Sequence, residues 1–142
     1  MKNILSIVLV LGVFYFSYSQ TRLLGSKSTE SGKEVSFNWS NEVKLKKDIE
    51  DIGLTVANKI MHCCSSWGGT NVGADIDFEN VKQNEVTGAF TIPLTVKWQG
   101  SLSGNQYWVQ GKLLVYSDGS KSWLKIKDSG GFYPGCSKNC IN

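Results

Sequence analysis

The sequence predicts an α+β domain in which one N-terminal strand and one long helix precede a four-strand antiparallel meander, with the helix packed on one sheet face. Three observations support this prediction. Apolar and polar residues alternate around Phe37, an apolar stripe recurs at helical spacing between Glu42 and His62, and the hairpins of the C-terminal half agree in register. With 41% apolar and 19% charged residues in 142 positions, the composition is that of a globular chain with one domain.

The first 19 residues have the three parts of a secretory signal. Lys2 supplies a basic start, an apolar run extends from Ile4 to Phe16, and Ser17 to Ser19 form a small-x-small cleavage site. We expect residues 20–32 to be a flexible leader and residues 33–142 to be the domain. The mature protein is then secreted or periplasmic, with no membrane span after signal removal and with its thiols oxidised.

The first strand and the helix follow from periodicity. Val35, Phe37 and Trp39 alternate with polar residues, which predicts a half-buried strand. Ser40 or Asn41 is the expected N-cap of the helix. The stripe that indicates one apolar helix face consists of Leu45, Ile49, Ile52, Val56 and Ile60.

Two hairpins give register predictions for the last three strands. A four-residue loop from Ser101 to Gly104 pairs Trp98 with Tyr107 and makes every inward pair apolar. Asp118-Gly119, read as a two-residue turn, gives the pairs Leu113 with Leu124, Gly111 with Ile126, Leu114 with Trp123 and Lys112 with Lys125.

A third hairpin closes the meander. A three-residue loop from Gln83 to Glu85 brings Ile76 opposite Ile92 and Phe78 opposite Phe90. Pro93 removes a donor from an interior strand, so we expect a bulge or a shortened neighbouring strand beside it.

Four cysteines stand as an adjacent pair and a spaced pair. We expect two long-range disulfides, each joining Cys63 or Cys64 to Cys136 or Cys140, with the connectivity left open. His62 next to Cys63 raises the alternative of an activated thiol, but the diverging helical side chains and the single histidine favour structural disulfides.

Three carboxylates alternate along one stretch, Asp75, Asp77 and Glu79. They could act as an acid and base pair in a small hydrolase or bind a cation, although an ordinary solvated strand face explains the pattern better. The chain has no glycine-rich phosphate loop and no serine nucleophile elbow, and no cofactor or metal is expected. We therefore expect a protein without catalytic activity.

The face of the sheet turned away from the helix is the predicted binding surface. Aromatic platforms beside lysines can stack on sugar rings while contacting anionic groups. We expect a binding module for a protein, a glycan or an acidic polymer, with self-association or cover by the tail as alternatives. The net charge of +3 gives no strong signal for nucleic-acid binding. The residues predicted for this surface are Lys97, Trp108, Lys112, Tyr116, Trp123 and Lys125, with Lys127 between them.

The element order of residues 34–128 resembles the cystatin-like fold. Leu23-Leu24-Gly25 in the leader and the run from Gln83 to Gly88 are similar to segments of cystatin inhibitors. The resemblance implies a cysteine protease inhibitor that uses Gly25, Gln83, Val86 and Gly88. The chain departs from the family pattern by one extra residue between Gln83 and Val86, and no Pro-Trp pair occurs in Ser101 to Gly104.

Overall fold

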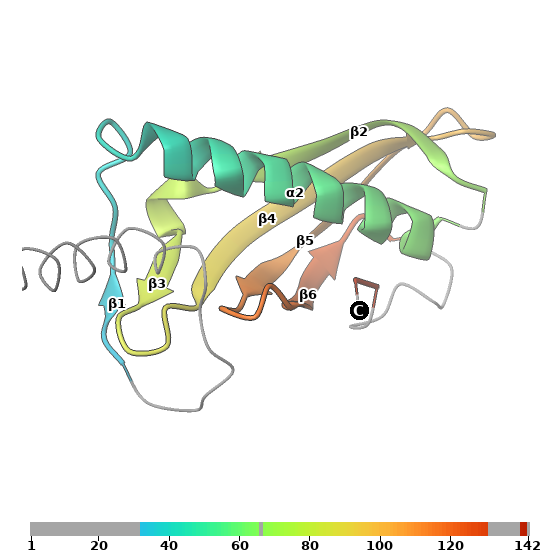
Figure 1. The fold of residues 1–142 in the computed structure, drawn as a ribbon. Helices are drawn as coiled ribbons and strands as arrows, with labels where there is room; N and C mark the ends of the chain where they lie inside the picture. The colour runs from blue at the N-terminus through green and yellow to red at the C-terminus, as the bar shows by residue number, and fades with distance from the viewer. Residues whose placement is uncertain (1–31, 66, 131–139, 142) are drawn as a thin grey trace, which may run out of the picture.

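The computed structural model describes residues 32–65, 67–130 and 140–141, and its fold is α+β, as predicted (Figure 1). One long helix, α2, packs on one face of a twisted antiparallel sheet that includes a short N-terminal strand. The elements are β1 (Glu34–Val35), α2 (Val43–Cys64), β2 (Gly69–Ile76), the 3-10 turn η2 (Phe78–Asn80), β3 (Lys82–Asn84), β4 (Phe90–Gly100), β5 (Gln106–Val115) and β6 (Lys121–Asp128).

Helix α2 confirms the predicted apolar stripe. Leu45, Ile49, Val56 and Ile60 are buried, and Ile52 packs at the margin of the core. Small residues lie on the same face and let the helix approach the sheet, since a Cβ on Gly53 would meet the Ile76 side chain. The N-cap prediction was wrong, because Glu42 occupies that position and makes no side-chain capping bond.

The residues before α2 leave the sheet after β1. The predicted strand around Val35 is only two residues long, and it pairs with β3 through Glu34 with Asn84 and Val35 with Gln83. Phe37 and Trp39 then pack as an aromatic cluster, with the Phe37 ring 5.7 Å from that of Phe90 and the Trp39 indole N–H bonded to the Phe78 carbonyl at 2.8 Å. Ring contacts therefore replace ladder bonds there.

The sheet runs in the order β1-β3-β4-β5-β6, with β2 also paired to β4. The single strand expected before the first hairpin is thus divided into β2 and β3 by the η2 turn. Ile76 pairs with Leu94 where Ile92 was expected, and Phe78 lies in η2 rather than opposite Phe90. Because β2 is shifted by two residues relative to β4, the same side chains of β2 still face the helix.

The division of β2 and β3 accounts for Pro93. The Pro93 carbonyl accepts the Asp77 amide at 3.2 Å, so the edge of Pro93 that has no N–H faces the interval between β2 and β3. The neighbouring strand is interrupted there, as expected.

The β4–β5 register is confirmed along its whole length. Trp98 pairs with Tyr107, Val96 with Val109 and Phe90 with Val115. The inward residues of β4 are all buried, and they form the centre of the core beneath α2.

The β5–β6 register was wrong by one residue. Tyr116 and Ser120 close the hairpin, and the loop of three residues ends in Gly119 at φ 77°. A three-residue loop with a left-handed glycine adds one residue to the predicted two-residue turn. Trp123 therefore pairs with Leu113 and is 2% exposed, whereas Leu124 pairs with Lys112 and is 44% exposed.

A disulfide between Cys63 and Cys140 fixes the end of the chain to the last turn of α2 and closes a sequence separation of 77 residues. Next to it, Ile141 is buried in the core. Cys63 thus bonds to a member of the spaced pair, as predicted. Cys136 lies outside the described residues, as do residues 1–19 and 20–31 of the predicted signal and leader.

Candidate functional site

The helix-free side of the sheet, called here the outer face, is formed by alternate residues of β4 and β5. Lys97 and Trp108 lie side by side on it as a cross-strand pair, and Thr95 pairs with Gln110 in the next outward position. Lys112 follows along β5 by alternation, and the same alternation carried one residue past the end of the strand at Val115 places Tyr116 on this side. Four of the six predicted binding residues, Lys97, Trp108, Lys112 and Tyr116, therefore share this face.

The other two predicted binding residues point to the helix side. Trp123 is part of the core, and Lys125 lies opposite Gly111, because the register differs by one residue from the prediction. The Lys125 ammonium bonds to the Asp128 carboxylate at 2.9 Å. A bulge between Gln110 and Gly111 then returns the strand to the predicted alignment, which leaves Lys127 opposite Gln110 on the outer face.

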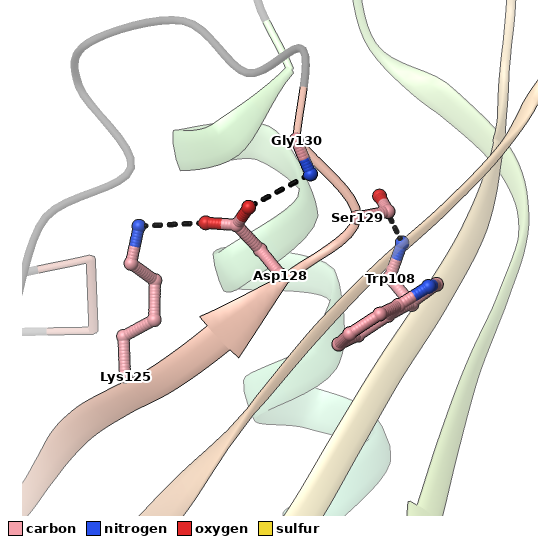
Figure 2. A network of polar contacts seen from close by, with 5 residues as sticks. All are labelled: Trp108, Lys125, Asp128, Ser129 and Gly130. Carbon is pink, nitrogen blue, oxygen red and sulfur yellow. Dashed lines mark hydrogen bonds and ion pairs between the residues drawn. The ribbon is translucent and has the colours of Figure 1, made fainter.

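The backbone of Trp108 is held by the residues that follow β6 (Figure 2). Its N–H donates to the Ser129 hydroxyl at 3.1 Å, and its carbonyl accepts the Ser129 N–H at 3.0 Å. The adjacent Asp128 carboxylate accepts from the Lys125 ammonium and from the Gly130 N–H at 2.8 Å. These two donors hold the pKa of Asp128 below its ordinary value.

The lysines around Trp108 differ in whether they form an ion pair. The Lys127 ammonium lies over the indole, 5.9 Å from the ring centroid. Lys97 forms an ion pair with Asp75 of β2. Lys112 has no ion pair with any residue that the structure describes. The outer face therefore presents two cations, those of Lys112 and Lys127, that are not neutralised by a described carboxylate.

Two exposed apolar side chains of β6 were not predicted as site residues. Leu124 lies opposite Lys112 on the outer face, and Ile126 is the unpaired residue at the bulge. The stretch Ser122 to Lys127 alternates in a way that puts apolar residues on both faces, so its periodicity does not say which face is buried. The length of the β5–β6 loop is the signal that could have placed Leu124 on the outer face.

The predicted inhibitory loop is a turn built on its own polar groups. The Gln83 side chain is buried and donates to the Gly88 carbonyl at 3.0 Å, so it supports the turn from within. The side-chain oxygen Oδ1 of Asn84 accepts hydrogen bonds from the backbone N–H groups of Val86 and Thr87. Val86 is 55% exposed at the apex. Gly25 lies outside the described residues.

Other segments lie at the same end of the sheet as this turn. The Glu85 N–H donates to the Lys33 carbonyl at 2.9 Å, which places the N-terminal segment beside it. Phe90 pairs with Val115, so the loop around Gly119 is also at this end. The Ser101 to Gly104 loop, which was compared with the second cystatin hairpin, lies at the opposite end.

The three candidate carboxylates do not share a strand face. Asp75 forms an ion pair with Lys97. The Asp77 carboxylate accepts a hydrogen bond from the Asn80 side-chain amide at 2.7 Å, and Glu79 belongs to η2. The strand ends at Ile76, which breaks the predicted alternation. In the described part of the chain, no group of three or more His, Cys, Asp or Glu side chains could hold a metal ion.

A groove of about 440 Å³ lies on the helix side, between α2 and the β5–β6 loop. Its lining includes Lys44, Asp48, Val115 and Lys121. Because both signs of charge line it, the groove does not select one class of ligand.

Comparison of the chain with family models, with curated proteins and with solved structures finds no match. Within the described ranges, no helix is long and apolar enough to cross a membrane.

Proposed function

We propose that the chain is an exported binding module without catalytic activity, and that its outer face holds an acidic, sugar-containing polymer. The observation that supports this most directly is the position of Trp108. Its backbone is fixed by Ser129 and its ring is exposed in part. The Lys127 ammonium lies over the ring from β6, and Lys112 offers a second charge further along β5.

The chemistry of such a ligand fits the side chains present. A sugar ring stacks on the Trp108 indole, because the apolar C–H face of a sugar and an aromatic face exclude water together. The Lys127 ammonium leaves its place over the ring and contacts a carboxylate or sulfate. Gln110, between Trp108 and Lys112 on the strand, supplies an amide for a hydroxyl group.

The length of this row favours a polymer over a single sugar. Outward side chains repeat every second residue, so the row from Trp108 to Lys112 extends about 13 Å along β5. Leu124, opposite Lys112, continues the surface onto β6. More than one unit of a chain is needed to contact the whole row.

The experiment is a titration of the protein with polygalacturonate and with heparin, using neutral dextran as the comparison. We expect the two acidic polymers to bind, dextran to bind weakly, and binding to weaken at high salt, because exposed charges are screened within about 10 Å at 0.1 M salt. Lys112→Ala should lower the affinity for the acidic polymers. Lys47→Ala, on the exposed face of α2, is the matched control.

Equal binding of dextran, or no binding of either acidic polymer, would reject this ligand class and leave the outer face to a protein partner. An effect of Lys47→Ala as large as that of Lys112→Ala would show that net charge, and not the outer face, drives association.

A second candidate function is inhibition of a cysteine protease, as the cystatin resemblance implies. Its support is the gathering of the N-terminal segment at Lys33, the 84–88 turn with exposed Val86, and the Gly119 loop at one end of the sheet. Residual activity of papain, titrated with micromolar protein, tests it. Val86→Asp should relieve the inhibition and Leu102→Asp, at the opposite end, should not; papain activity that never falls excludes this function.

A further inference from the structure

Two connecting segments meet at the end of the sheet opposite the 84–88 turn. The β4–β5 turn at 101–105 lies beside residues 65 and 67–68, which come between α2 and β2, and both segments are at one end of the molecule in Figure 1. Gly69 pairs with Gly100, and a Cβ on Gly68 would be 3.9 Å from the Ser101 hydroxyl. The described residues of these two segments are called here the tip.

Each segment of the tip puts one large apolar side chain into solvent. Trp67 and Leu102 are both 75% exposed, more than any other large apolar side chain of the described residues. Neither lies on the outer face or in the 84–88 turn. The tip therefore exposes apolar surface that neither proposed function uses.

Charged side chains are absent from the sequence around the tip. Residues 63–74 and 98–111 contain no Asp, Glu, Lys, Arg or His. The charged side chains that come next along the strands, Asp75 and Lys97, form an ion pair with each other. This matters because charged groups are the side chains that a bilayer excludes most strongly.

Several polar groups of the tip are bonded within it or to the adjoining strand ends. The Gly104 N–H donates to the Gly100 carbonyl at 2.9 Å, and the Gly100 N–H donates to the Asn105 carbonyl at 2.9 Å. In the other segment the Ser65 hydroxyl donates to the Gly68 carbonyl at 2.7 Å. The bonded groups are compatible with the edge of a bilayer, because hydrocarbon favours backbone groups that are already satisfied.

We propose that the tip inserts Trp67 and Leu102 into the surface of a lipid bilayer. Tryptophan prefers the membrane–water interface, and leucine prefers the hydrocarbon beneath it. Two side chains on short turns reach only the boundary of head groups and acyl chains, so the attachment is shallow and reversible. The outer face, which lies behind the tip, stays in water.

The test is co-sedimentation of the oxidised protein with vesicles of phosphatidylcholine, which have no net charge, together with the tryptophan emission spectrum. Leu102→Ser should reduce the partition coefficient about tenfold, because it removes most of one buried leucine side chain. Trp67→Ser should reduce it as well and should abolish the blue shift of the emission. Leu54→Ser, at a helix residue that is 47% exposed, is the control.

All variants are made in one background and their N-termini are determined by mass, so residues 4–16 contribute equally wherever they are retained. Wild-type binding that Leu102→Ser weakens and Leu54→Ser does not weaken supports the proposal. Absence of binding overturns it and leaves the tip to a protein or glycan. Binding that requires added phosphatidylglycerol and is unchanged by Leu102→Ser also overturns it, because lysines then account for the attraction.

Discussion

Trp123 packs over Gly111 across the β5–β6 hairpin. A Cβ on Gly111 would lie 2.7 Å from Cζ2 of the indole and 2.4 Å from the Leu124 carbonyl oxygen. The glycine in the middle of β5 thus leaves the space that the Trp123 ring fills. This packing fixes which side of β6 joins the core, and consequently which residues remain on the outer face.

We expect Trp123→Ala to destabilise the fold by about 3–5 kcal/mol, the usual cost of removing a buried large aromatic side chain. Leu124→Ala, at the neighbouring residue on the other face, should change stability by about 0.5 kcal/mol or less. Urea denaturation followed by circular dichroism measures both. A larger loss of stability for Leu124→Ala than for Trp123→Ala would contradict this register and favour the one that a two-residue turn gives.

Gly111→Ala should cost about 1–3 kcal/mol, because the added methyl forces the indole or the β6 backbone to move. Gly73→Ala is the matched control, since a Cβ there has no neighbour within 4 Å. The control should be neutral or slightly stabilising. Denaturant midpoints compare the two variants, and equal losses would contradict the close packing of Trp123 on Gly111.

The parts of the fold that could be predicted are those in which periodicity and loop length agree. The stripe from Leu45 to Ile60 has a single apolar face, and the β4–β5 hairpin has only one register that pairs apolar residues inward. On β6 both faces carry apolar residues, so the predicted β5–β6 register depended only on the type of turn assumed. Gly119 takes φ 77° in a three-residue loop, which the Asp-Gly pair does not distinguish from a two-residue turn.

The outer face was predicted only in part, because the β4–β5 register was right and the β5–β6 register was wrong. Residues on β4 and β5, such as Lys97 and Trp108, are on the outer face because that register was right. Trp123 and Lys125 are not, and Leu124 takes an outward position. The tip was missed because exposure of Trp67 and Leu102 depends on two loops that meet only in the folded chain.

Loss of all disulfides should lower the stability of the fold by at least about 4 kcal/mol, because the Cys63–Cys140 bond closes a loop of 77 residues in the unfolded chain, and the second bond predicted for Cys64 would keep nearly the same loop closed if it remained. The variant with Cys63, Cys64, Cys136 and Cys140 all replaced by Ser tests this without leaving an unpaired thiol. Thermal and urea unfolding should both shift to lower midpoints. A midpoint equal to that of the oxidised wild type would show that the disulfides add nothing to the packing of Ile141.

Asp128 should make stability depend on pH in acid. Its pKa is lowered from the ordinary 3.8 by the Lys125 ammonium and then by the Gly130 N–H, so the ionised form stabilises the fold. That contribution is complete above the ordinary pKa and is lost as the pH falls through the lowered value. Asp128→Asn should therefore be less stable than wild type at pH 7, and the difference should vanish at the lowest pH. A difference independent of pH would contradict it.

The central claim, that the outer face binds an acidic polymer through Trp108, is tested most directly by measuring the affinity of Trp108→Ala for polygalacturonate by calorimetry. Trp67→Ala, which removes an exposed tryptophan away from the outer face, is measured beside it. We expect Trp108→Ala to lose about tenfold or more in affinity, since each 1.4 kcal/mol of lost stacking is a factor of ten, and Trp67→Ala to bind as wild type does. Equal affinities for wild type and Trp108→Ala, with both proteins folded, would contradict the claim.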